Sequence, residues 1–325
     1  MQEFYDCHGD FFIRWIKDQW GICFKCLHAD FQIQGSPERT LSRVVFESED
    51  KGLYLIEKFS AQKFTLRNKV ALSIEYVNQN GLTQALTYQK SRNNEFLSFY
   101  KGACYQISHF LNSTGVQRPQ YLNSAGIGES FARFLVRLFK CSNGIEKRIE
   151  FQPFSLKPYI YKLFREMHKY DTIMFKRYLP YLNYLEKEFM DIHDNFRLAY
   201  CHGDLHPLNV IWNNEKILAV IDWEFTGIKP DIYDAANLVG CAGIEDPNGL
   251  TMPMVMTFID QIKHNRLFSR IGWKYFTDYV LALRFAWLSE WLRKKDYEML
   301  DMEAAYMKIL VDNMDDIKKG WGIHD

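Results

Sequence analysis

One stretch of ten residues, followed by a short hairpin, constrains this chain more than any other feature of its sequence. The stretch is Tyr200-Cys201-His202-Gly203-Asp204-Leu205-His206-Pro207-Leu208-Asn209. After it come two β-rich runs at 210–212 and 217–221, joined by a polar turn and followed by Asp222. Runs of this kind, bounded by turn residues, are typical of a β-hairpin. Because the hairpin returns the chain toward its starting point, we expect Asn209 and Asp222 to lie near each other.

The residue types in this stretch suit the transfer of a phosphoryl group to a hydroxyl. The catalytic loop of protein kinases reads His-Arg-Asp-Leu-x-x-x-Asn; its Asp accepts the hydroxyl proton and its Asn holds Mg²⁺. His202, Asp204 and Asn209 fall in that register, with Gly203 in place of the arginine. Hard cations prefer carboxylate and amide oxygens. We therefore predict Asp204 as the base, His202 as a support of the loop, and Asn209 with Asp222 as ligands of one or two Mg²⁺ ions.

The run from His202 to Asn209, together with Ile221-Asp222-Trp223-Glu224, resembles the aminoglycoside phosphotransferase and choline kinase superfamily. Gly after His, and Asp-Trp-Glu in place of Asp-Phe-Gly, point to this small-molecule branch rather than to protein kinases. The resemblance implies an α+β, bilobal, protein-kinase-like fold with a small antiparallel β-sheet N-lobe and a larger, mostly helical C-lobe. We place the N-lobe at residues 1–108 and expect it to bind the nucleotide. The C-lobe, at residues 109–325, then holds the catalytic loop, the metal site and the acceptor pocket.

The resemblance also implies an activity: ATP-dependent transfer of the γ-phosphate to a hydroxyl of a small molecule, with ATP bound between the lobes. The acceptor class stays open among a sugar, an amino alcohol and an aminoglycoside-like compound. The aromatic helices of the C-terminal half suit a sugar, an amino alcohol or a choline-like cation equally well. An aminoglycoside pocket usually needs many carboxylates, and the balanced charge of the chain gives no indication of one. A first copy of the tetrapeptide, Cys7-His8-Gly9-Asp10, has Trp15 where the Asn should stand. No hairpin with a metal-binding Asp follows that copy, so we interpret it as a chance repeat.

Composition excludes several other classes of protein. Forty Lys and Arg balance forty Asp and Glu among 325 residues, so no overall charge indicates nucleic acid or an anionic membrane as partner. Seven cysteines are an odd number and predict reduced thiols rather than a disulfide framework. Cys23 and Cys26 have a zinc-like spacing, but no second pair stands at finger spacing. No basic-then-apolar leader and no uncharged window of about twenty residues is present, so we expect a soluble cytoplasmic protein. The sequence gives no indication of its oligomeric state.

The N-terminal third predicts the elements of a small lobe. An amphipathic helix is expected over residues 3–20, and three antiparallel strands over 29–34, 41–48 and 53–59. In a kinase-like lobe the turn at 35–40 covers the nucleotide phosphates, and Ser36 is its candidate phosphate contact. A second amphipathic helix is expected over 66–78, with Val70, Ile74 and Val77 on its apolar face and Asn80-Gly81 as its stop.

Further nucleotide-binding residues follow from the resemblance. The third strand of such a lobe carries a cation for the α- and β-phosphates, and Lys58 is our candidate. Glu57 and Lys58 point to opposite faces of that strand, so Glu57 can occupy the cleft position instead. Glu75 on the second helix is the candidate partner of the strand lysine. Residues 105–110 predict the strand that leads into the adenine-binding hinge, with Gln106 as a nucleotide contact.

The C-terminal part predicts helices that begin within 130–139 and 159–170 and fill most of 250–318. His206 is a further candidate for contact with acceptor or phosphate, or else it hydrogen-bonds the backbone. Asp234 suits the N-cap of the helix that follows the metal-binding segment, where the superfamily often has an acidic residue that braces the catalytic loop.

Two other functions stay open at this point. A kinase-like protein that binds nucleotide without catalysis would usually lack the base or a metal ligand, and here both are present, although the strand lysine is in doubt. A metal-dependent phosphoesterase could use His202, Asp204 and His206 as ligands. The further Asn-His-Glu or Asn-His-Asp ligand set of such hydrolases is missing from the sequence.

Overall fold

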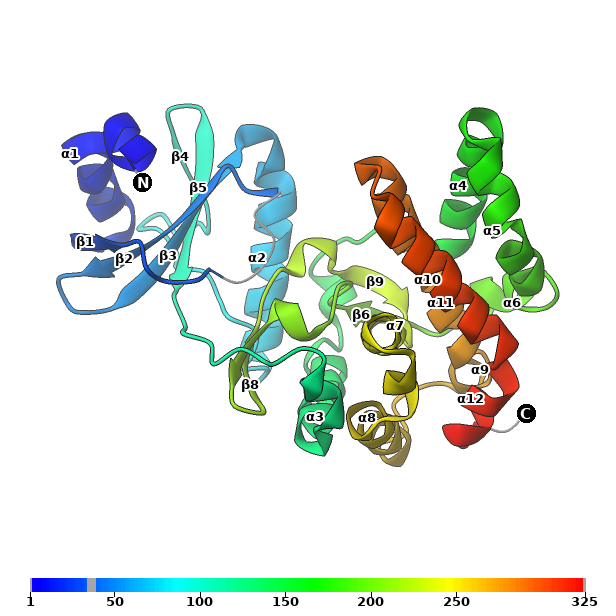
Figure 1. The fold of residues 1–325 in the computed structure, drawn as a ribbon. Helices are drawn as coiled ribbons and strands as arrows, with labels where there is room; N and C mark the ends of the chain where they lie inside the picture. Colours follow the sequence, from blue (N-terminus) through cyan, green and yellow to red (C-terminus); the bar gives the residue numbers. More distant parts are fainter. Residues whose placement is uncertain (1, 34–38, 324–325) are drawn as a thin grey trace. The chain divides into compact units, whose positions relative to one another are not determined.

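The chain divides into two compact units. The computed structural model describes the backbone of residues 2–33 and 39–323, and side chains from residue 9 onward within those ranges. One unit comprises residues 1–115, 141–149 and 208–224, and the other comprises residues 116–140, 150–207 and 225–325. Figure 1 shows the course of the chain through both.

The described residues of the first unit form a five-stranded antiparallel sheet, two helices and a separate hairpin. The strand order in the sheet is β1-β2-β3-β5-β4. Its helices and strands are α1 (Gln2–Trp20), β1 (Phe24–His28), β2 (Ser42–Ser48), β3 (Leu53–Ser60), α2 (Phe64–Gln79), β4 (Ser98–Tyr100), β5 (Ala103–His109), β7 (Val210–Asn213) and β8 (Lys216–Val220).

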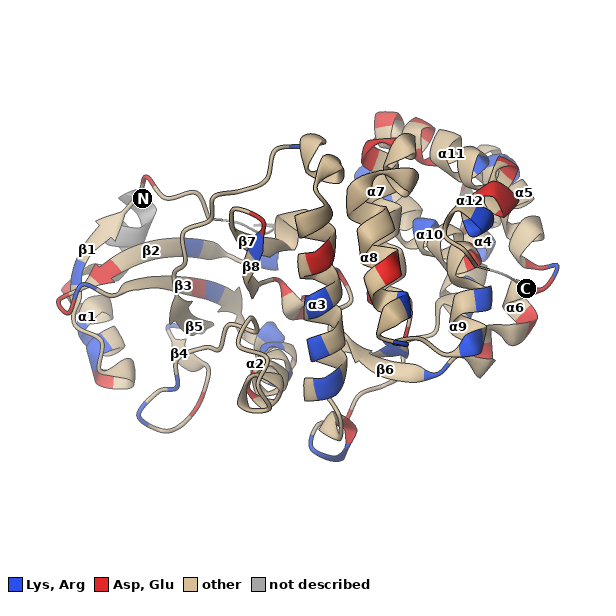
Figure 2. Ribbon diagram, turned by 90° about the horizontal axis from the view of Figure 1, so that it is seen from below, with Lys and Arg blue, Asp and Glu red and all other residues tan. Residues whose placement is uncertain are grey.

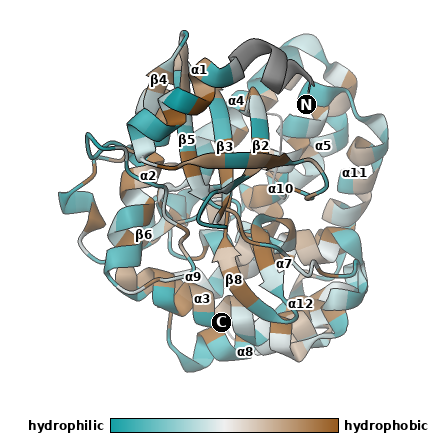
Figure 3. Cartoon of the chain, turned by 90° about the vertical axis from the view of Figure 1, so that its left-hand side faces the viewer, coloured by the Kyte–Doolittle hydropathy of each residue, from teal (hydrophilic) through white to brown (hydrophobic). Residues whose placement is uncertain are grey.

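The two faces of this sheet are buried by different helices. Strands β2 and β3 carry both hydrophobic and hydrophilic residues (Figure 3), as expected where neighbouring side chains point to opposite faces. On one face, Phe12 and Ile16 of α1 form a core with Phe46, Ile56 and Ile107 of the strands. On the other face, Ala71 of α2 packs with Phe59 and Cys104. Leu55 and Glu57, which lie on this second face of β3, line a pocket that is described below.

The β7–β8 hairpin belongs to the first unit although about a hundred residues separate it from β5. The N–H of Val220 donates to the carbonyl of Gln84 at 2.9 Å. On the other strand, the N–H of Trp212 donates to the hydroxyl of Ser113 at 2.9 Å. Trp212 itself is fully buried. These contacts anchor both strands of the hairpin, so the segment that ends in Asp222 has a defined position within the unit.

The second unit is mostly helical and holds one small two-stranded sheet, β6 paired with β9. Figure 2 shows Lys and Arg interspersed with Asp and Glu on its helices. Its helices and strands are α3 (Ala125–Cys141, whose last residue belongs to the first unit), α4 (Leu156–Tyr170), α5 (Thr172–Leu185), α6 (Phe189–Ile192), β6 (Leu198–Cys201), β9 (Gly227–Pro230), α7 (Tyr233–Glu245), α8 (Pro253–His264), α9 (Arg270–Lys274), α10 (Phe276–Lys294), α11 (Tyr297–Asp312) and α12 (Met314–Gly320).

A buried ion pair joins α10 to α11 in the second unit. The guanidinium of Arg284 donates to both carboxylate oxygens of Glu303, from Nε to Oε1 at 2.7 Å and from Nη2 to Oε2 at 2.8 Å. Arg284 is 2% exposed and Glu303 is fully buried. This pairing gives the Arg284 side chain a structural role.

The predicted fold class is confirmed: an antiparallel sheet with few helices in one unit, and mostly helices in the other. The helix expected over 3–20 is α1, which is interrupted by a kink at Gly9 with φ +39°, and the helix expected over 66–78 is α2. The hairpin after Asn209 is β7–β8. Among the described residues, no helix is long and apolar enough to cross a membrane.

One predicted strand is wrong. Residues 29–33 are not a strand, and the first strand is β1, which ends where His28 pairs with Val45. The alternation of apolar and polar residues around Phe31 is typical of a strand. In the structure, the Phe31 ring instead packs against the rings of His28 and Phe110, at centroid distances of 5.2 and 5.0 Å. The rest of that range lies outside the described residues.

Candidate active site

The turn that carries Asp204 is held by a buried carboxylate. Both oxygens of Asp234, in the first turn of α7, accept backbone N–H groups at 2.7 Å, one from His202 and one from Gly203. The N-cap of α7 is Ile232, so the predicted capping role of Asp234 is wrong, while the bracing role that the resemblance implied matches these bonds. A carboxylate that accepts two backbone donors fixes their direction, and with it the start of the loop.

The side chain of His202 also stabilises this turn. Its side chain is fully buried, and its Nδ1 accepts the backbone N–H of Asp204 at 3.2 Å. Because Nδ1 is the acceptor, the proton of the neutral imidazole is on Nε2. A buried ring that accepts the backbone N–H of Asp204 helps to position that residue.

Gly203 is required where protein kinases have an arginine. Its φ is +87°, in the left-handed region. A Cβ at this position would lie 2.2 Å from the carbonyl oxygen of Phe225. No side chain fits there, so the glycine that distinguishes this loop from the protein-kinase pattern has a steric cause.

Asp204 and His206 lie together beyond the turn. His206 Nε2 is 3.6 Å from Asp204 Oδ1, and the two side chains are 14% and 18% exposed. The His206 ring also lies 6.3 Å from that of Trp287 on α10, between ring centroids. The amide of Asn237 donates to the carbonyl of Leu205 at 3.1 Å and fixes the backbone between them. A carboxylate that is partly open to solvent beside an imidazole can accept a proton.

Burial shifts the pKa values of three side chains near the loop, those of Asp234, Lys229 and Cys201. It raises the pKa of Asp234 to about 6, although the N–H groups of Gly203 and His202 oppose the shift. Burial also lowers the pKa of Lys229, which lies over the rings of Phe154 and Tyr233 at 4.4 and 4.7 Å. Cys201 is buried as well, which raises its thiol pKa well above the usual value and leaves it a packing residue.

In the first unit, the β7–β8 hairpin places Asn209 next to Ile221, the residue before Asp222. The N–H of Ile221 donates to the carbonyl of Asn209 at 2.9 Å, next to the paired residues Val210 and Val220. Asp222 has φ +60°, a conformation that non-glycine residues adopt at a cost and that clusters at functional sites. An amide oxygen and a carboxylate on adjacent backbone segments suit a hard divalent cation.

Asp222 also lines an open pocket of about 850 Å³, including the space at its mouth, whose walls come entirely from the first unit. The sheet contributes Leu55 and Glu57, and the hairpin contributes Val220 and Ile221. Three guanidinium groups border it, from Arg39, Arg43 and Arg67. Guanidinium groups that converge on one pocket suit a polyanionic ligand such as a phosphate chain.

The cations of this pocket are not the ones predicted. Glu57 occupies the cleft face of β3, in a cross-strand row with Arg43 on β2 and Gln106 on β5. Gln106 Nε2 donates to Glu57 Oε2 at 3.0 Å. Burial raises the pKa of Glu57, while the charges of Arg67 and Arg43 and the bond from Gln106 oppose that shift.

The candidate pair Lys58 and Glu75 is not formed. Lys58 points to the other face of β3, with its Nζ 6.0 Å from the Tyr105 ring centroid, and Glu75 Oε1 pairs with Lys90 Nζ at 2.5 Å. The physical reason is strand alternation: with Glu57 in the cleft, its neighbour must face away. The remaining candidate, Ser36, lies outside the described residues.

Glu224 was noted in the sequence only as part of the Asp-Trp-Glu triplet. Its carboxylate is 6% exposed and pairs with Lys63 at 2.9 Å, Arg67 at 3.3 Å and Arg39 at 3.8 Å. It therefore holds two of the three pocket arginines in place, two residues after Asp222. The sequence analysis did not identify Arg39, Arg43 and Arg67, which come from three separate segments of the chain. Finding Arg43 requires the register of β2 against β3, and finding Arg67 requires knowing which face of α2 lies toward the sheet.

Residues 113–268 match the model of the phosphotransferase enzyme family. The matched range contains both His202–Asn209 and Asp222. A comparison with curated proteins found no match.

Solved structures share the fold at low sequence identity. An aminoglycoside phosphotransferase from Alicyclobacillus acidocaldarius has a TM-score of 0.63 at 12% identity, covering 91% of this chain and 94% of that one. Amicoumacin kinase, solved in complex with AMP-PNP, Ca²⁺ and Ami, has a TM-score of 0.62 at 12% identity, covering 96% of each chain. An ethanolamine kinase from Plasmodium vivax has a TM-score of 0.53 at 14% identity, covering 87% and 82%.

These findings confirm the resemblance that the loop and hairpin indicated, and together they support an enzyme of the small-molecule phosphotransferase class. The chain has the protein-kinase-like fold of the aminoglycoside phosphotransferases, and its residues 113–268 match the model of the phosphotransferase enzyme family.

Proposed function

We propose that this protein transfers the γ-phosphate of ATP to a hydroxyl group of a small molecule, with Asp204 as the base. The observation that carries the proposal is the bracing of the His202-Gly203 turn by Asp234, which presents Asp204 on a fixed backbone. Its position on that turn suits a residue that orients the acceptor hydroxyl and takes its proton. His202 has a positioning role, and His206 lies close enough to Asp204 to contact an acceptor or its phosphate.

The pocket of the first unit is the proposed nucleotide site. Arg43 and Arg67 supply the positive charge that the resemblance had assigned to Lys58, and Gln106 reaches the pocket through its bond to Glu57. The same donor set suits phosphate oxygens because guanidinium groups bind them with two parallel hydrogen bonds. The AMP-PNP bound to amicoumacin kinase supports a nucleoside triphosphate as the ligand.

We assign Asn209 and Asp222 as the protein ligands of a divalent cation, with Mg²⁺ as the expected ion. The fit rests on an amide and a carboxylate oxygen held by one hairpin, with Asp222 in a strained conformation. Such an ion neutralises the charge that develops on a transferring phosphoryl group. The Ca²⁺ in the amicoumacin kinase complex supports a hard divalent cation of this kind.

The acceptor is proposed as a small molecule with a free hydroxyl. The names of the structural neighbours include an aminoglycoside phosphotransferase and an ethanolamine kinase, so they support sugars and amino alcohols alike. We also propose a cytoplasmic location, where ATP is abundant.

The test is transfer of labelled γ-phosphate from ATP to a panel of aminoglycosides, sugars and amino alcohols, with Asp204→Asn as the control. We expect the variant to bind ATP with Mg²⁺ as the wild type does, by thermal shift, and to lose about 10²–10⁴-fold in turnover. Full turnover in Asp204→Asn would remove Asp204 as the base. ATP binding without transfer to any acceptor would favour the nucleotide-binding protein without catalysis.

A further inference from the structure

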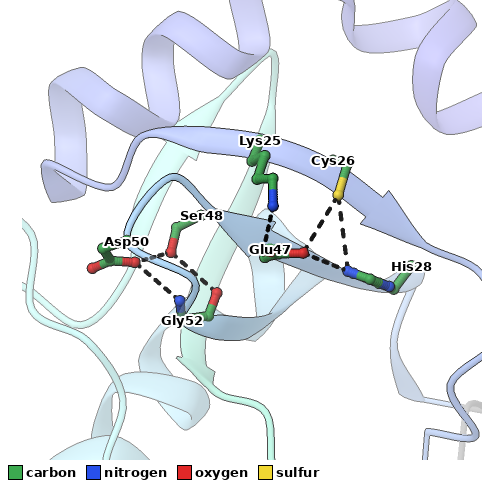
Figure 4. Close-up of polar contacts among 7 residues, drawn as sticks. All are labelled: Lys25, Cys26, His28, Glu47, Ser48, Asp50 and Gly52. Atoms are coloured by element: carbon green, nitrogen blue, oxygen red, sulfur yellow. Dashed lines mark hydrogen bonds and ion pairs between the residues drawn. The ribbon is translucent and has the colours of Figure 1, made fainter.

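Three potential metal ligands meet on β1 and β2, and none of the three lines the proposed nucleotide pocket. Figure 4 shows the side chains of Cys26 and His28, both on β1, converging on Glu47 of β2. The Cys26 Sγ is 3.8 Å from His28 Nε2 and 3.7 Å from Glu47 Oε2, and those nitrogen and oxygen atoms are 3.2 Å apart. Among the described residues, these three side chains form a cluster with metal-ligand spacing.

The strand register brings them together. Cys26 is the direct partner of Glu47 across the two strands, and His28 is two residues further along β1. Residues two apart on a strand share a face, and so do cross-strand partners. The residue between them, Leu27, pairs with Phe46 and packs into the core beneath α1. The cluster therefore lies on the face that α1 does not cover, and all three side chains are partly exposed.

We propose that Cys26, His28 and Glu47 form a binding site for a borderline divalent metal ion, with Zn²⁺ as the preferred ion. A tetrahedral Zn²⁺ with bonds of about 2.3 Å to sulfur and about 2.0 Å to nitrogen and oxygen separates its ligand atoms by roughly 3.3–3.6 Å. The three distances above fall within a few tenths of an ångström of that range. Thiolate and imidazole ligands select zinc over Mg²⁺, so this site differs in chemistry from the oxygen ligands Asn209 and Asp222.

The neighbouring Lys25 orients the carboxylate of Glu47. Its Nζ lies 2.6 Å from Glu47 Oε1, which leaves the other oxygen, Oε2, directed at Cys26 and His28. Second contacts of this kind orient metal ligands. With three protein ligands, the fourth position is left to water or to an external ligand.

Cobalt substitution tests this site in the full-length protein. The protein is freed of metal with a chelator and titrated with Co²⁺, whose charge-transfer absorption requires a thiolate ligand. We expect this absorption to saturate at one Co²⁺ per chain and Zn²⁺ to abolish it. The oxygen ligands proposed for the phosphotransferase site cannot produce it, so the outcome is independent of that function.

The variants Cys26→Ser and His28→Gln separate this site from other metal binding. We expect Cys26→Ser to lose the charge-transfer absorption. Each variant should weaken Zn²⁺ binding by more than about 100-fold, since loss of an outer contact alone costs 10–100-fold. Cys23→Ser is the matched control and should bind as the wild type does.

Two results would overturn the proposal: no thiolate absorption in the wild type, or an absorption that persists in Cys26→Ser. Thermal melts of the metal-free variants check folding. If Cys26→Ser does not fold, His28→Gln decides the matter, because an unchanged Zn²⁺ affinity in that variant excludes the site.

Discussion

One oxygen of Asp234 accepts the backbone N–H of Gly203 at 2.7 Å, and the other accepts that of His202 at the same distance. Replacing Asp234 with Ala leaves both buried donors without an acceptor. Because an unsatisfied buried donor costs about 1–3 kcal/mol, we expect the free energy of unfolding to fall by roughly 2 kcal/mol or more. Denaturant unfolding measures this loss, and a fall in kcat with little change in ATP affinity would show that the loop is displaced. A fully active Asp234→Ala would contradict the bracing role.

The pH dependence should identify the same carboxylate. Burial raises its pKa from 3.8 to about 6, so the folded state holds this proton more tightly than the unfolded state does. The contribution of Asp234 to stability is therefore greatest below pH 4 and declines as pH rises to about 6, by on the order of 3 kcal/mol. The measurement is the difference in unfolding free energy between wild type and Asp234→Asn at several pH values. A difference that does not vary with pH would show that Asp234 does not titrate in this window.

Gly203→Ala tests the steric requirement of the turn. The new Cβ would meet the carbonyl oxygen of Phe225 at 2.2 Å in addition to the strain at φ +87°. We expect a loss of about 2 kcal/mol or more and a large loss of activity. Gly102→Ala is the matched control, because its φ is +79° but no atom lies within 4 Å of the added Cβ. Equal losses in the two variants would assign the effect to backbone strain alone.

Arg43→Gln tests which cation serves the proposed nucleotide pocket. Arg43 lines the pocket, while Lys58 lies on the opposite face of the sheet. Because hydrogen bonds to charged groups contribute about 1.5–3 kcal/mol, we expect Arg43→Gln to raise the Kd for ATP by on the order of tenfold or more. Lys58→Gln should leave the Kd within about twofold of the wild-type value. Calorimetric titration measures both, and the reverse order would restore Lys58 as the phosphate contact.

Glu303→Gln should destabilise the second unit. The change leaves the buried guanidinium of Arg284 without its counter-charge, which typically costs about 3–5 kcal/mol. The control is Glu290→Gln, which removes a partly exposed pair with Arg293 on the same helix, worth at most about 1 kcal/mol. Urea unfolding of both variants measures the difference. A loss of under about 1 kcal/mol for Glu303→Gln would mean that the helices repack around the site.

The sequence predicted best those parts of the site that are local in the chain. The loop, the hairpin and the return to Asp222 follow from turn residues and β-rich runs within about twenty positions. The pocket arginines could not be found in this way, since Arg43 reaches the cleft only through the register of β2 against β3. Strand alternation correctly limited the choice to Glu57 or Lys58, but it does not reveal which face meets the pocket. The lobe boundary at residue 108 and the roles of the site residues stay predictions.

The steric demand at Gly203 has a consequence for regulation. Phosphorylated loops in protein kinases are commonly ordered by new contacts between the phosphate and an arginine. A position that admits no side chain cannot supply such an arginine next to Asp204, the proposed base. A permanent carboxylate, Asp234, holds this turn instead. The shape of this turn is therefore set by a side chain that is always present in the chain, and no side chain added at position 203 can order it.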